Sequence, residues 1–250
     1  MAKATGEQNG DGEEAVKTRK RQPRANRVRK LLLDVALDCF STNGFNGTST
    51  RMIAEASGFS HSLVTYHFES KDKLWIATME EVIGSHASRV ERIVNGHPHL
   101  SAADRLEIFI EEVVRAFQTK PQIHQIFTQQ STQTSERLDW LVDHYVRSQF
   151  EQVTQLIKEG QDEGAVREGD PARIYYFIIS AAGMPFAVAR EYKMLTGRDM
   201  FSPAEVYHMV TTLSDFTFSR TRPAAEPPAD AKDKGPAVGK PTRRKVSSGD

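Results

Sequence analysis

The sequence predicts an all-α protein in which an N-terminal three-helix helix-turn-helix head precedes a larger C-terminal helical bundle, with about nine helices in total. Apolar residues recur at spacings of three and four along most of the chain, and no segment alternates long enough to indicate a half-buried strand. Hydroxyl, aspartate and proline residues that begin helices, and glycines that end them, punctuate this pattern. The 250 residues are also enough to bury a sizeable core.

Composition divides the chain into four parts. Residues 1–24 and 221–250 are rich in charged residues, glycine or proline and hold few large apolar side chains, so we expect a disordered basic arm and a disordered tail. Between them we place the helix-turn-helix head at 25–70 and the helical body at 71–220.

Charge is balanced overall but uneven along the chain. The 33 basic and 33 acidic residues cancel, yet eight basic residues and no acidic one lie between Lys17 and Lys30. Such a block can contact phosphates from an arm, and it can equally be a solubilising tail. The basic patch from Lys240 to Lys245 leaves the same two readings open for the tail, with a plain flexible tail favoured.

The cysteine, histidine and hydropathy patterns bear on metal binding and on the cellular compartment of the protein. The single Cys39 excludes a disulfide within the chain, and no Cys/His cluster has zinc-ligand spacing, so we expect no metal and no cofactor. The polar N-terminus does not resemble a secretory signal. The longest uncharged run, Ile174 to Ala189, is shorter than the roughly 20 residues of a spanning helix. We therefore expect a cytoplasmic protein without membrane contact.

The head contains three short helical patterns. The first has one apolar face, which carries Val28, Leu32, Val35, Ala36, Cys39 and Phe40, and Asn43-Gly44 supplies a left-handed stop. Hydroxyls at Thr48, Ser49 and Thr50 are candidate caps for a second helix that ends at Gly58. Ser60 caps the third helix, which runs from His61 to Phe68.

Two short helices joined by a glycine-containing turn form the geometry that enters a major groove of double-stranded DNA. Hydroxyl, imidazole and ammonium groups near the helix starts suit phosphate oxygens, and the predicted phosphate-binding residues are Thr50, Ser60, Tyr66, His67 and Lys71. Base edges would be read by the front of the third helix and one residue of the second, namely Arg51, His61, Ser62 and Thr65. Taken singly, each hydroxyl could be a helix cap alone.

The segment from Leu31 to Trp75 resembles the N-terminal DNA-binding domain of the TetR family of bacterial transcriptional regulators. The resemblance rests on Phe40, Gly44-Phe45, Thr48-Ser49-Thr50, Ile53-Ala54, Gly58-Phe59-Ser60, Tyr66-His67-Phe68, Lys71 and Leu74. It implies that the predicted phosphate set contacts the DNA backbone and that His61 and Ser62 approach bases. The chain departs from the commonest family pattern at Ser62, where glycine is frequent, and at Thr65, where tyrosine is frequent.

Beyond the head, the periodicity predicts six more helices, at about 71–95, 101–119, 122–130, 135–163, 171–195 and 203–219. Three of them have clear N-terminal signals. Ser101 and Asp104 form a capping box, and Asp170-Pro171 and Ser202-Pro203 each place a cap before a proline in the first helical turn.

The helix predicted at 171–195 is apolar nearly all round, so it must be covered on two sides. The family resemblance implies a homodimer through the last two helices, which would place two heads on paired DNA half-sites. The predicted interface residues are Ala182, Gly183, Phe186, Tyr207 and Phe216. The alternative is that this helix is the centre of a monomeric bundle.

The body of such a bundle can hold a small-molecule effector in a pocket with apolar walls and few polar groups. The candidate lining residues are Phe109, Val113, Phe117, His124, Phe127, Trp140, His144, Tyr145, Phe177 and Met184. Each of them can also be an ordinary core residue.

These observations predict a homodimeric transcriptional regulator, a repressor that leaves a palindromic operator when an unidentified small molecule binds. No nucleophile, phosphate loop, metal set or carboxylate pair indicates an enzyme, although observed turnover of a ligand would revive that reading. A DNA-bound adaptor of the same fold, controlled by a protein partner, is the other alternative.

Overall fold

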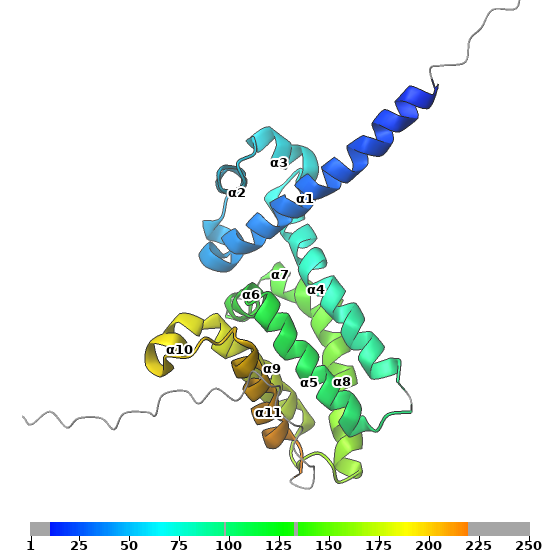
Figure 1. Cartoon of the computed structure of the whole chain (residues 1–250), viewed down its shortest axis with the longest axis vertical. Coiled ribbons are helices and arrows are strands. Elements are labelled where there is room, and N and C mark those ends of the chain that lie inside the picture. Colours follow the sequence, from blue (N-terminus) through cyan, green and yellow to red (C-terminus); the bar gives the residue numbers. More distant parts are fainter. Residues whose placement is uncertain (1–10, 98, 133–134, 220–250) are drawn as a thin grey trace, which may run out of the picture. The chain divides into compact units, whose positions relative to one another are not determined.

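The computed structural model describes residues 11–97, 99–132 and 135–219, and within these ranges it is helical and contains no strand (Figure 1). One isolated antiparallel bridge joins Val166 and Phe218. The predicted all-α class is confirmed. The described residues form eleven α-helices rather than nine, because two of the predicted helices are each divided in two.

The chain forms two compact units. The first consists of the described residues up to Ser88 together with 125–145, and the second of Arg89–His124 together with the described residues from Val146 onward. The first unit therefore continues past residue 70, the predicted end of the head, into helix α4, Lys71–Asn95. The reason is hydrophobic, because Leu74 and Trp75 are buried in the same core as the head helices.

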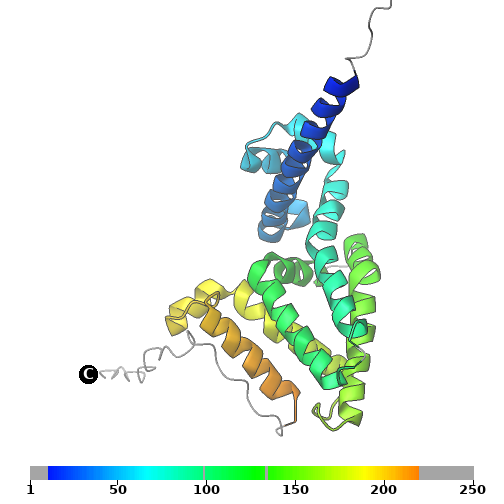
Figure 2. The same ribbon diagram turned by 45° about the vertical axis from the view of Figure 1, so that its right-hand side comes forward.

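Four helices lie wholly in the first unit, and two more lie partly in it. Their bounds are α1 Asp11–Gly47, α2 Thr50–Ser57, α3 His61–Phe68, α4 Lys71–Asn95, α6 Gln122–Ser131 and α7 Glu136–Leu141, of which α4 ends in the second unit and α6 begins there. The predicted apolar face of the first helix is confirmed, since Leu32, Ala36 and Phe40 are buried in the core of this unit. Both views show α2 and α3 beside α1 (Figure 2).

Helix α1 begins at Asp11, whereas the sequence predicts disorder over residues 1–24. The physical reason is that residues 13–21 are mostly glutamate, alanine, lysine and arginine, which favour helix, and they continue a helix that is anchored further along. Residues 1–10 and the predicted tail at 221–250 lie outside the described residues.

Helix α1 is kinked at Gly44, shortly before its end at Gly47. The φ of 69° and ψ of 172° of Gly44 kink the chain, and glycine adopts this conformation far more readily than other residues. The sequence predicts a left-handed stop at Asn43-Gly44. The φ of Gly44 is positive as that requires, but its ψ lies outside the left-handed helical region and the helix continues to Gly47, so the structure has a kink here instead. The buried hydroxyl of Thr48 then donates to the carbonyl oxygens of Cys39 (3.0 Å) and Gly44 (2.7 Å), which ties the following loop back to α1.

The second unit is built from α5 Ala102–Thr119, α8 Arg147–Asp162, α9 Pro171–Ala187, α10 Ala189–Thr196 and α11 Pro203–Thr217. Helices α5, α8 and α9 pack on one another, and α11 packs on α5 and α9 (Figure 2). The three predicted N-terminal signals are confirmed, since Ser101, Asp170 and Ser202 each accept a backbone N–H of the following turn.

Two predicted helices are interrupted. The one predicted at 135–163 contains a π-helical turn, Val142–Val146, between α7 and α8. The one predicted at 171–195 breaks at Val188 and bends by 74° between α9 and α10. Pro185 explains this second break, because proline lacks the N–H of the helical ladder and its ring collides with the preceding turn.

Among the described helices, none taken singly has the length and apolar composition needed to cross a membrane, and only the bent pair α9 and α10 meets that test together.

Candidate nucleic-acid interface

Two helix caps fix the backbone of the candidate interface. The hydroxyl of Ser49, and not that of Thr48 or Thr50, caps α2 by accepting the N–H of Met52 at 3.1 Å. Helix α2 ends at Gly58, whose φ of 72° and ψ of 14° are left-handed and whose N–H returns to Ala54 and Glu55. Ser60 then caps α3 by accepting the N–H of Leu63 at 3.3 Å. The caps satisfy donors that a helix start otherwise leaves unpaired.

Packing leaves the polar face of α3 toward solvent. Val64 and Phe68 are buried in the core of the first unit, which forces the intervening side chains outward. His61, Thr65 and Tyr66 are exposed, and the Tyr66 side chain is 81% accessible. A helix of eight residues depends on that packing for its stability.

Hydrogen bonds join residues of α2 and α3 that the sequence assigns to different roles. The Thr50 hydroxyl and the Nε2 atom of His61 lie 2.9 Å apart and share a hydrogen bond. The hydroxyls of Ser60 and Ser62 share another at 3.0 Å. These bonds hold the exposed side chains in fixed positions, so that less side-chain entropy is lost when a ligand is bound.

Several predicted residues line one hollow of about 520 Å³ in the first unit. Thr50, His61, Thr65 and Lys71 lie on its wall with Ser49, a predicted helix cap. Asn46, Ser70 and the acidic Glu69, which the sequence analysis did not single out, also line it. Hydroxyl and amide groups gathered in this way can donate to phosphate oxygens. Ser60, Ser62, Tyr66, His67 and Arg51 are not part of this wall.

Lys71, which the sequence predicts to bind phosphate, also stabilises the backbone that precedes α2. Its ammonium group donates to the carbonyl oxygens of Phe45 (3.0 Å) and Thr48 (3.1 Å) and lies 4.2 Å from the centre of the Phe45 ring. Lys71 therefore holds the loop that leads into α2, and one of its three protons is left for a phosphate. No sequence signal indicates these carbonyl partners, because they lie more than twenty residues earlier in the chain.

Glu69 is a second feature that the sequence does not reveal. It caps the C-terminus of α3 with a φ of 61°, the one positive φ at a non-glycine residue within the described ranges. Its carboxylate pairs with Lys73 four residues later. A non-glycine residue in this region is strained, and the strain is offset by the N–H of Glu69, which donates to Thr65 at 2.8 Å.

The residues predicted to line an effector pocket fall in both units. Phe127, Trp140, His144 and Tyr145 belong to the first, where the rings of Trp140 and His144 stack at 4.5 Å. The others belong to the second: Phe109, Val113, Phe117, His124, Phe177 and Met184.

Within the second unit the predicted pocket residues differ in burial. Phe109 and Val113 are fully buried core residues, while Phe177 and Met184 are exposed. The ring of His124 contacts Phe117 edge-on and covers Gly183. Burial lowers the pKa of His124 below its usual 6.5, because a low-polarity surrounding disfavours the imidazolium form.

The residues predicted to form the dimer interface are also divided. Ala182, Gly183 and Phe186 are buried inside the second unit, so they lack the exposed area that a partner would cover. Tyr207 is half-buried, and Phe216 is 62% exposed. The physical reason for this correction is that the small residues of α9 face inward, where Gly183 makes room for the His124 ring.

Comparison with known protein families identifies both parts of the chain. The family described as "Bacterial regulatory proteins, tetR family" matches residues 32–78, and the family described as "Tetracyclin repressor-like, C-terminal domain" matches residues 103–217. Together these matches span more than half of the chain and include both helices of the candidate interface.

Individual relatives are more distant. The chain is 26% identical over 184 residues to the HTH-type transcriptional regulator RutR of Escherichia coli O157:H7, across 73% of this chain and 85% of that one. It is 24% identical over 192 residues to the HTH-type transcriptional repressor AcnR of Corynebacterium efficiens, across 74% and 90% of the two chains. The fold is similar to that of the ketosteroid transcriptional regulator KstR2 of Mycobacterium tuberculosis, with a TM-score of 0.64, 18% identity and coverage of 77% and 95%.

Proposed function

Because the chain belongs to the TetR family of bacterial transcriptional regulators, we propose that it represses transcription as a homodimer bound to a partly palindromic operator. We further propose that a small molecule bound in the body releases it. The curated relatives are transcriptional regulators and not enzymes, and one of them is named a repressor.

The observation that carries the proposal is the exposed face of α3. This helix contains no acidic residue, and its exposed hydroxyl, imidazole and phenol groups stand beside the capped start of α2. Groups of this kind bind phosphate oxygens and base edges, and a short recognition helix enters the major groove with its N-terminal residues. His61 and Ser62 occupy those N-terminal positions.

For phosphate contact we propose Thr50, Ser60, Tyr66, His67 and Lys71, and for base contact Arg51, His61, Ser62 and Thr65. The exposure of Tyr66 and the position of Thr50 on the wall of the hollow support the first set. Because Thr50 and His61 share a hydrogen bond, the two sets act together and their substitutions will not be additive.

The proposed dimer uses the exposed apolar side chains of α9 and α11. Phe177 and Phe216 contact each other with ring centres 5.9 Å apart, and both are exposed, as are Tyr176 and Met184. Exposed apolar patches of this kind mark sites of protein association. These four residues replace Ala182, Gly183 and Phe186 in the proposed interface.

Release by an effector is proposed as a population shift. A ligand displaces the equilibrium only if it binds the DNA-free conformation more tightly than the DNA-bound one. Phe117 and His124 are the residues of the predicted pocket that combine an aromatic wall with a half-buried polar group in direct contact. We place the effector near them.

The test of DNA binding is selection of duplexes from a random pool, followed by anisotropy titrations of the selected duplex at several salt concentrations. We expect sequence-preferring binding whose affinity falls steeply with salt. Tyr66→Phe should weaken binding to all duplexes alike, because it removes a phosphate donor, whereas His61→Ala should change the preference among them. Tyr192→Phe, in α10, is the matched control in the second unit. Binding without sequence preference or salt dependence would contradict the proposed function.

A further inference from the structure

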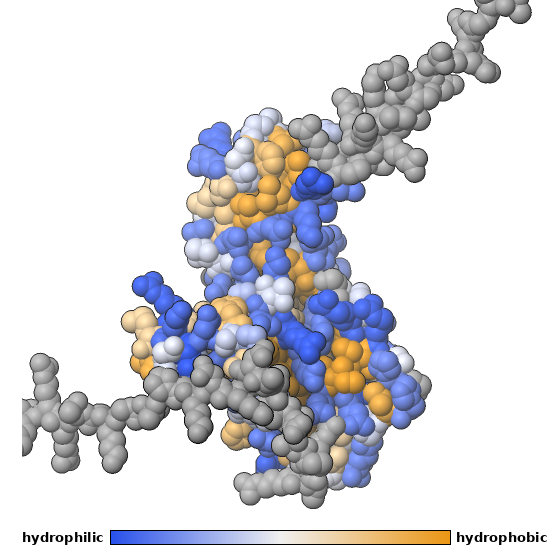
Figure 3. All heavy atoms as spheres, in the orientation of Figure 1, coloured by the Kyte–Doolittle hydropathy of each residue, from blue (hydrophilic) through white to orange (hydrophobic). Residues whose placement is uncertain are grey.

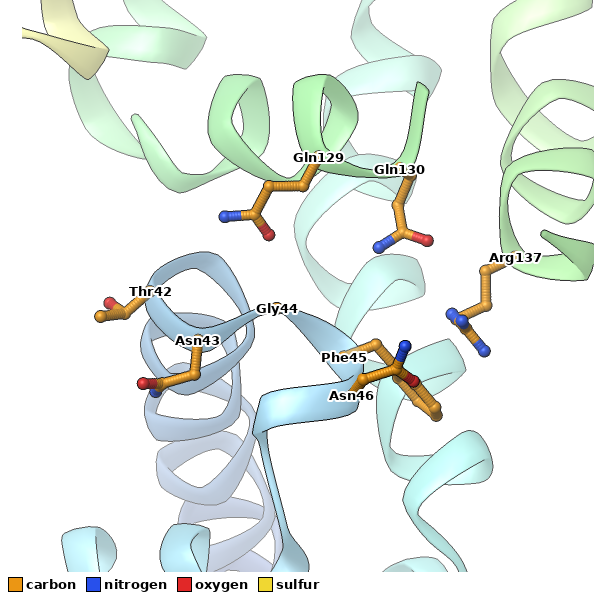
Figure 4. A pocket seen from close by; sticks show the side chains of 8 residues that line it. All are labelled: Thr42, Asn43, Gly44, Phe45, Asn46, Gln129, Gln130 and Arg137. Atoms are coloured by element: carbon orange, nitrogen blue, oxygen red, sulfur yellow. The ribbon is translucent and has the colours of Figure 1, made fainter. Parts of the chain in front are cut away.

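A second, smaller hollow lies in the first unit and shares only Asn46 with the wall of the hollow in the candidate interface. It has a volume of about 280 Å³ and is lined by residues 42–46, around the kink near the end of α1, and by Gln129, Gln130 and Arg137. Figure 4 shows Gln129 and Gln130 extending from α6 toward this segment, with Arg137 reaching in from α7. Ligand sites commonly measure about 300–1,000 Å³, and this hollow lies just below that range, so it has room only for a ligand of a few heavy atoms.

We propose that this hollow binds a small carboxylate that also carries a hydrogen-bond donor, such as a short hydroxy acid. We propose further that the bound anion weakens DNA binding. The regulatory part rests on the proposed function, whereas the binding site itself does not.

The charge of the hollow points to an anion. The guanidinium carbon of Arg137 lies 3.8 Å from the centre of the Phe45 ring, and the Lys71 ammonium lies 4.2 Å from the same centre. The two positive charges are therefore within about 8 Å of each other, a distance at which they repel. No acidic residue lines the hollow, and within the described part of the chain Arg137 has no carboxylate partner.

The hollow also contains a hydrogen-bond donor and an acceptor that have no partner among the described residues, and these indicate which groups the anion carries besides its charge. The Nε atom of Arg137 is buried without an acceptor. The amide nitrogen of Gln129 donates to the carbonyl oxygen of Ser41 at 2.6 Å, which fixes the orientation of the side chain, and the amide oxygen of Gln129 is buried without a donor. A buried polar group without a partner destabilises a protein, so a ligand that pairs both groups would bind favourably.

A single ligand can satisfy both groups. A carboxylate accepts two parallel hydrogen bonds from a guanidinium, and a hydroxyl on the neighbouring carbon donates to the Gln129 amide oxygen. The Gln130 amide, which is buried and contacts Ser135 at 3.4 Å, can add a further bond in either sense. One arginine matches one carboxylate charge, which favours a monocarboxylate over the doubly charged phosphate.

The loop beneath this hollow is the same loop that leads into α2. The carbonyl oxygens of Phe45 and Thr48 hold Lys71, and Ser49 caps the helix. An anion bound to Arg137 lowers the positive potential at Lys71, which is one of the proposed phosphate contacts. We therefore expect the occupied protein to bind DNA less tightly.

To test the site, the full-length protein is titrated separately with lactate, propionate and lactamide at constant ionic strength. Binding is measured from the NMR chemical shifts of the Phe45 and Gln129 backbone amides. Lactate should bind about tenfold more tightly than propionate, which lacks the hydroxyl, and than lactamide, which lacks the charge. Arg137→Gln should weaken lactate binding at least tenfold, and Arg137→Lys should weaken it less because the charge remains. Arg190→Gln, at an exposed position of α10, should leave it unchanged.

Equal affinity for the three compounds, tighter binding of inorganic phosphate, or an equal effect of the Arg190 and Arg137 substitutions would overturn the proposed site. Thermal unfolding of each variant shows whether it folds, and the Arg137→Lys comparison still applies if the Arg137→Gln variant does not fold.

The regulatory part is tested in the DNA titration. There, lactate should raise the dissociation constant of the complex between DNA and the wild-type protein and leave that of the Arg137→Gln variant unaltered. If lactate binds to the protein but does not change its affinity for DNA, the proposed regulation is wrong and the proposed binding site still stands. Absence of any DNA complex contradicts the proposed function instead, while the NMR titration still reports on the site.

Discussion

The exposed face of α3 carries polar side chains that form hydrogen bonds, whereas the exposed face of α9 and α11 carries apolar side chains that form none. On α3 the exposed polar groups already bond to neighbours in the same surface, as Thr50 does to His61 and Ser60 to Ser62. On α9 and α11 the exposed groups are apolar rings and thioethers, such as Phe177, Phe216 and Met184, which water cannot satisfy. The side chains on the α3 surface are therefore held in position before DNA binds. The surface of α9 and α11 favours a binding partner that covers its apolar side chains and excludes water from them.

This difference sets the expected energetics of the two surfaces. Apolar area contributes about 25 cal/mol for each Å² that is removed from water, so association of the apolar face is driven by burial and depends weakly on salt. A polar face that binds a polyanion gains affinity from phosphate contacts and loses it steeply as salt is added. Hydrophobic side chains are also exposed over α10 in the same unit (Figure 3), where Met194 and Leu195 are both 78% accessible.

The largest expected effect comes from placing a charge in the apolar face. Phe216→Glu should raise the dissociation constant of the dimer about 100-fold, because an unpaired carboxylate would be buried between the subunits. Sedimentation velocity over a range of protein concentrations measures this change. Gln155→Glu, at an exposed position of α8, is the control for added charge. An unchanged dimer in the Phe216 variant would remove α11 from the interface.

A methyl group at Gly183 should destabilise the second unit by up to about 3 kcal/mol. The added carbon would lie 2.1 Å from the Cδ2 atom of His124, which is far inside van der Waals contact. Gly84→Ala is the matched control in the first unit, since its nearest neighbour, the Tyr145 hydroxyl, is 3.9 Å away. That variant should gain up to about 1 kcal/mol, as alanine is the better helix former. Urea denaturation of both variants gives the free energies of unfolding, and equal values would contradict the packing described for His124.

Lys71→Met should lower the free energy of unfolding by about 1 kcal/mol, in addition to weakening DNA binding. The substitution removes the bonds to Phe45 and Thr48 and leaves their carbonyl oxygens without this donor. Lys73→Met removes an exposed pair with Glu69 and should change stability by less than about 0.5 kcal/mol. If the two variants unfold at the same denaturant concentration, Lys71 does not hold the loop.

The smallest expected effect is a dependence of stability on pH. Burial lowers the pKa of His124 in the folded protein, so the unfolded chain takes up a proton first when the pH falls below about 6.5. Stability should therefore decrease between pH 7 and pH 5, by less than about 1.4 kcal/mol per pH unit for this group. His124→Gln should flatten the profile, whereas His208→Gln, at an exposed position, should not. Parallel profiles for wild type and His124→Gln would contradict the assignment.

The elements with local signals could be predicted closely from the sequence. The fourth helix is predicted at 71–95 and spans Lys71–Asn95, because capping groups and apolar spacing define it within its own residues. The positive φ at Gly44 and the cap at Ser60 follow from the same kind of local chemistry. The order and exposure of the α3 side chains are likewise consequences of a short apolar period.

Features that depend on distant contacts could not be predicted. The small residues of α9 suggest close helix approach, but which side they face is decided by His124, about sixty residues earlier. The bond between Lys71 and the Phe45 carbonyl, and the burial of Trp75 with Leu141, arise only when separate segments fold together. The π-helical turn at Val142–Val146 leaves no local mark in the sequence that we can identify.

The hydrogen bond between Thr50 and His61 also bears on how such a regulator changes over generations. In the proposed interface, a substitution of His61 that changes the base preference also frees the hydroxyl of Thr50, which is one of the proposed phosphate contacts. Preference and overall affinity therefore cannot be adjusted one at a time at this pair. New operator preferences are more accessible through Ser62 and Arg51, which do not share that bond, and paired changes at residues 50 and 61 are expected when the His61 position itself diverges.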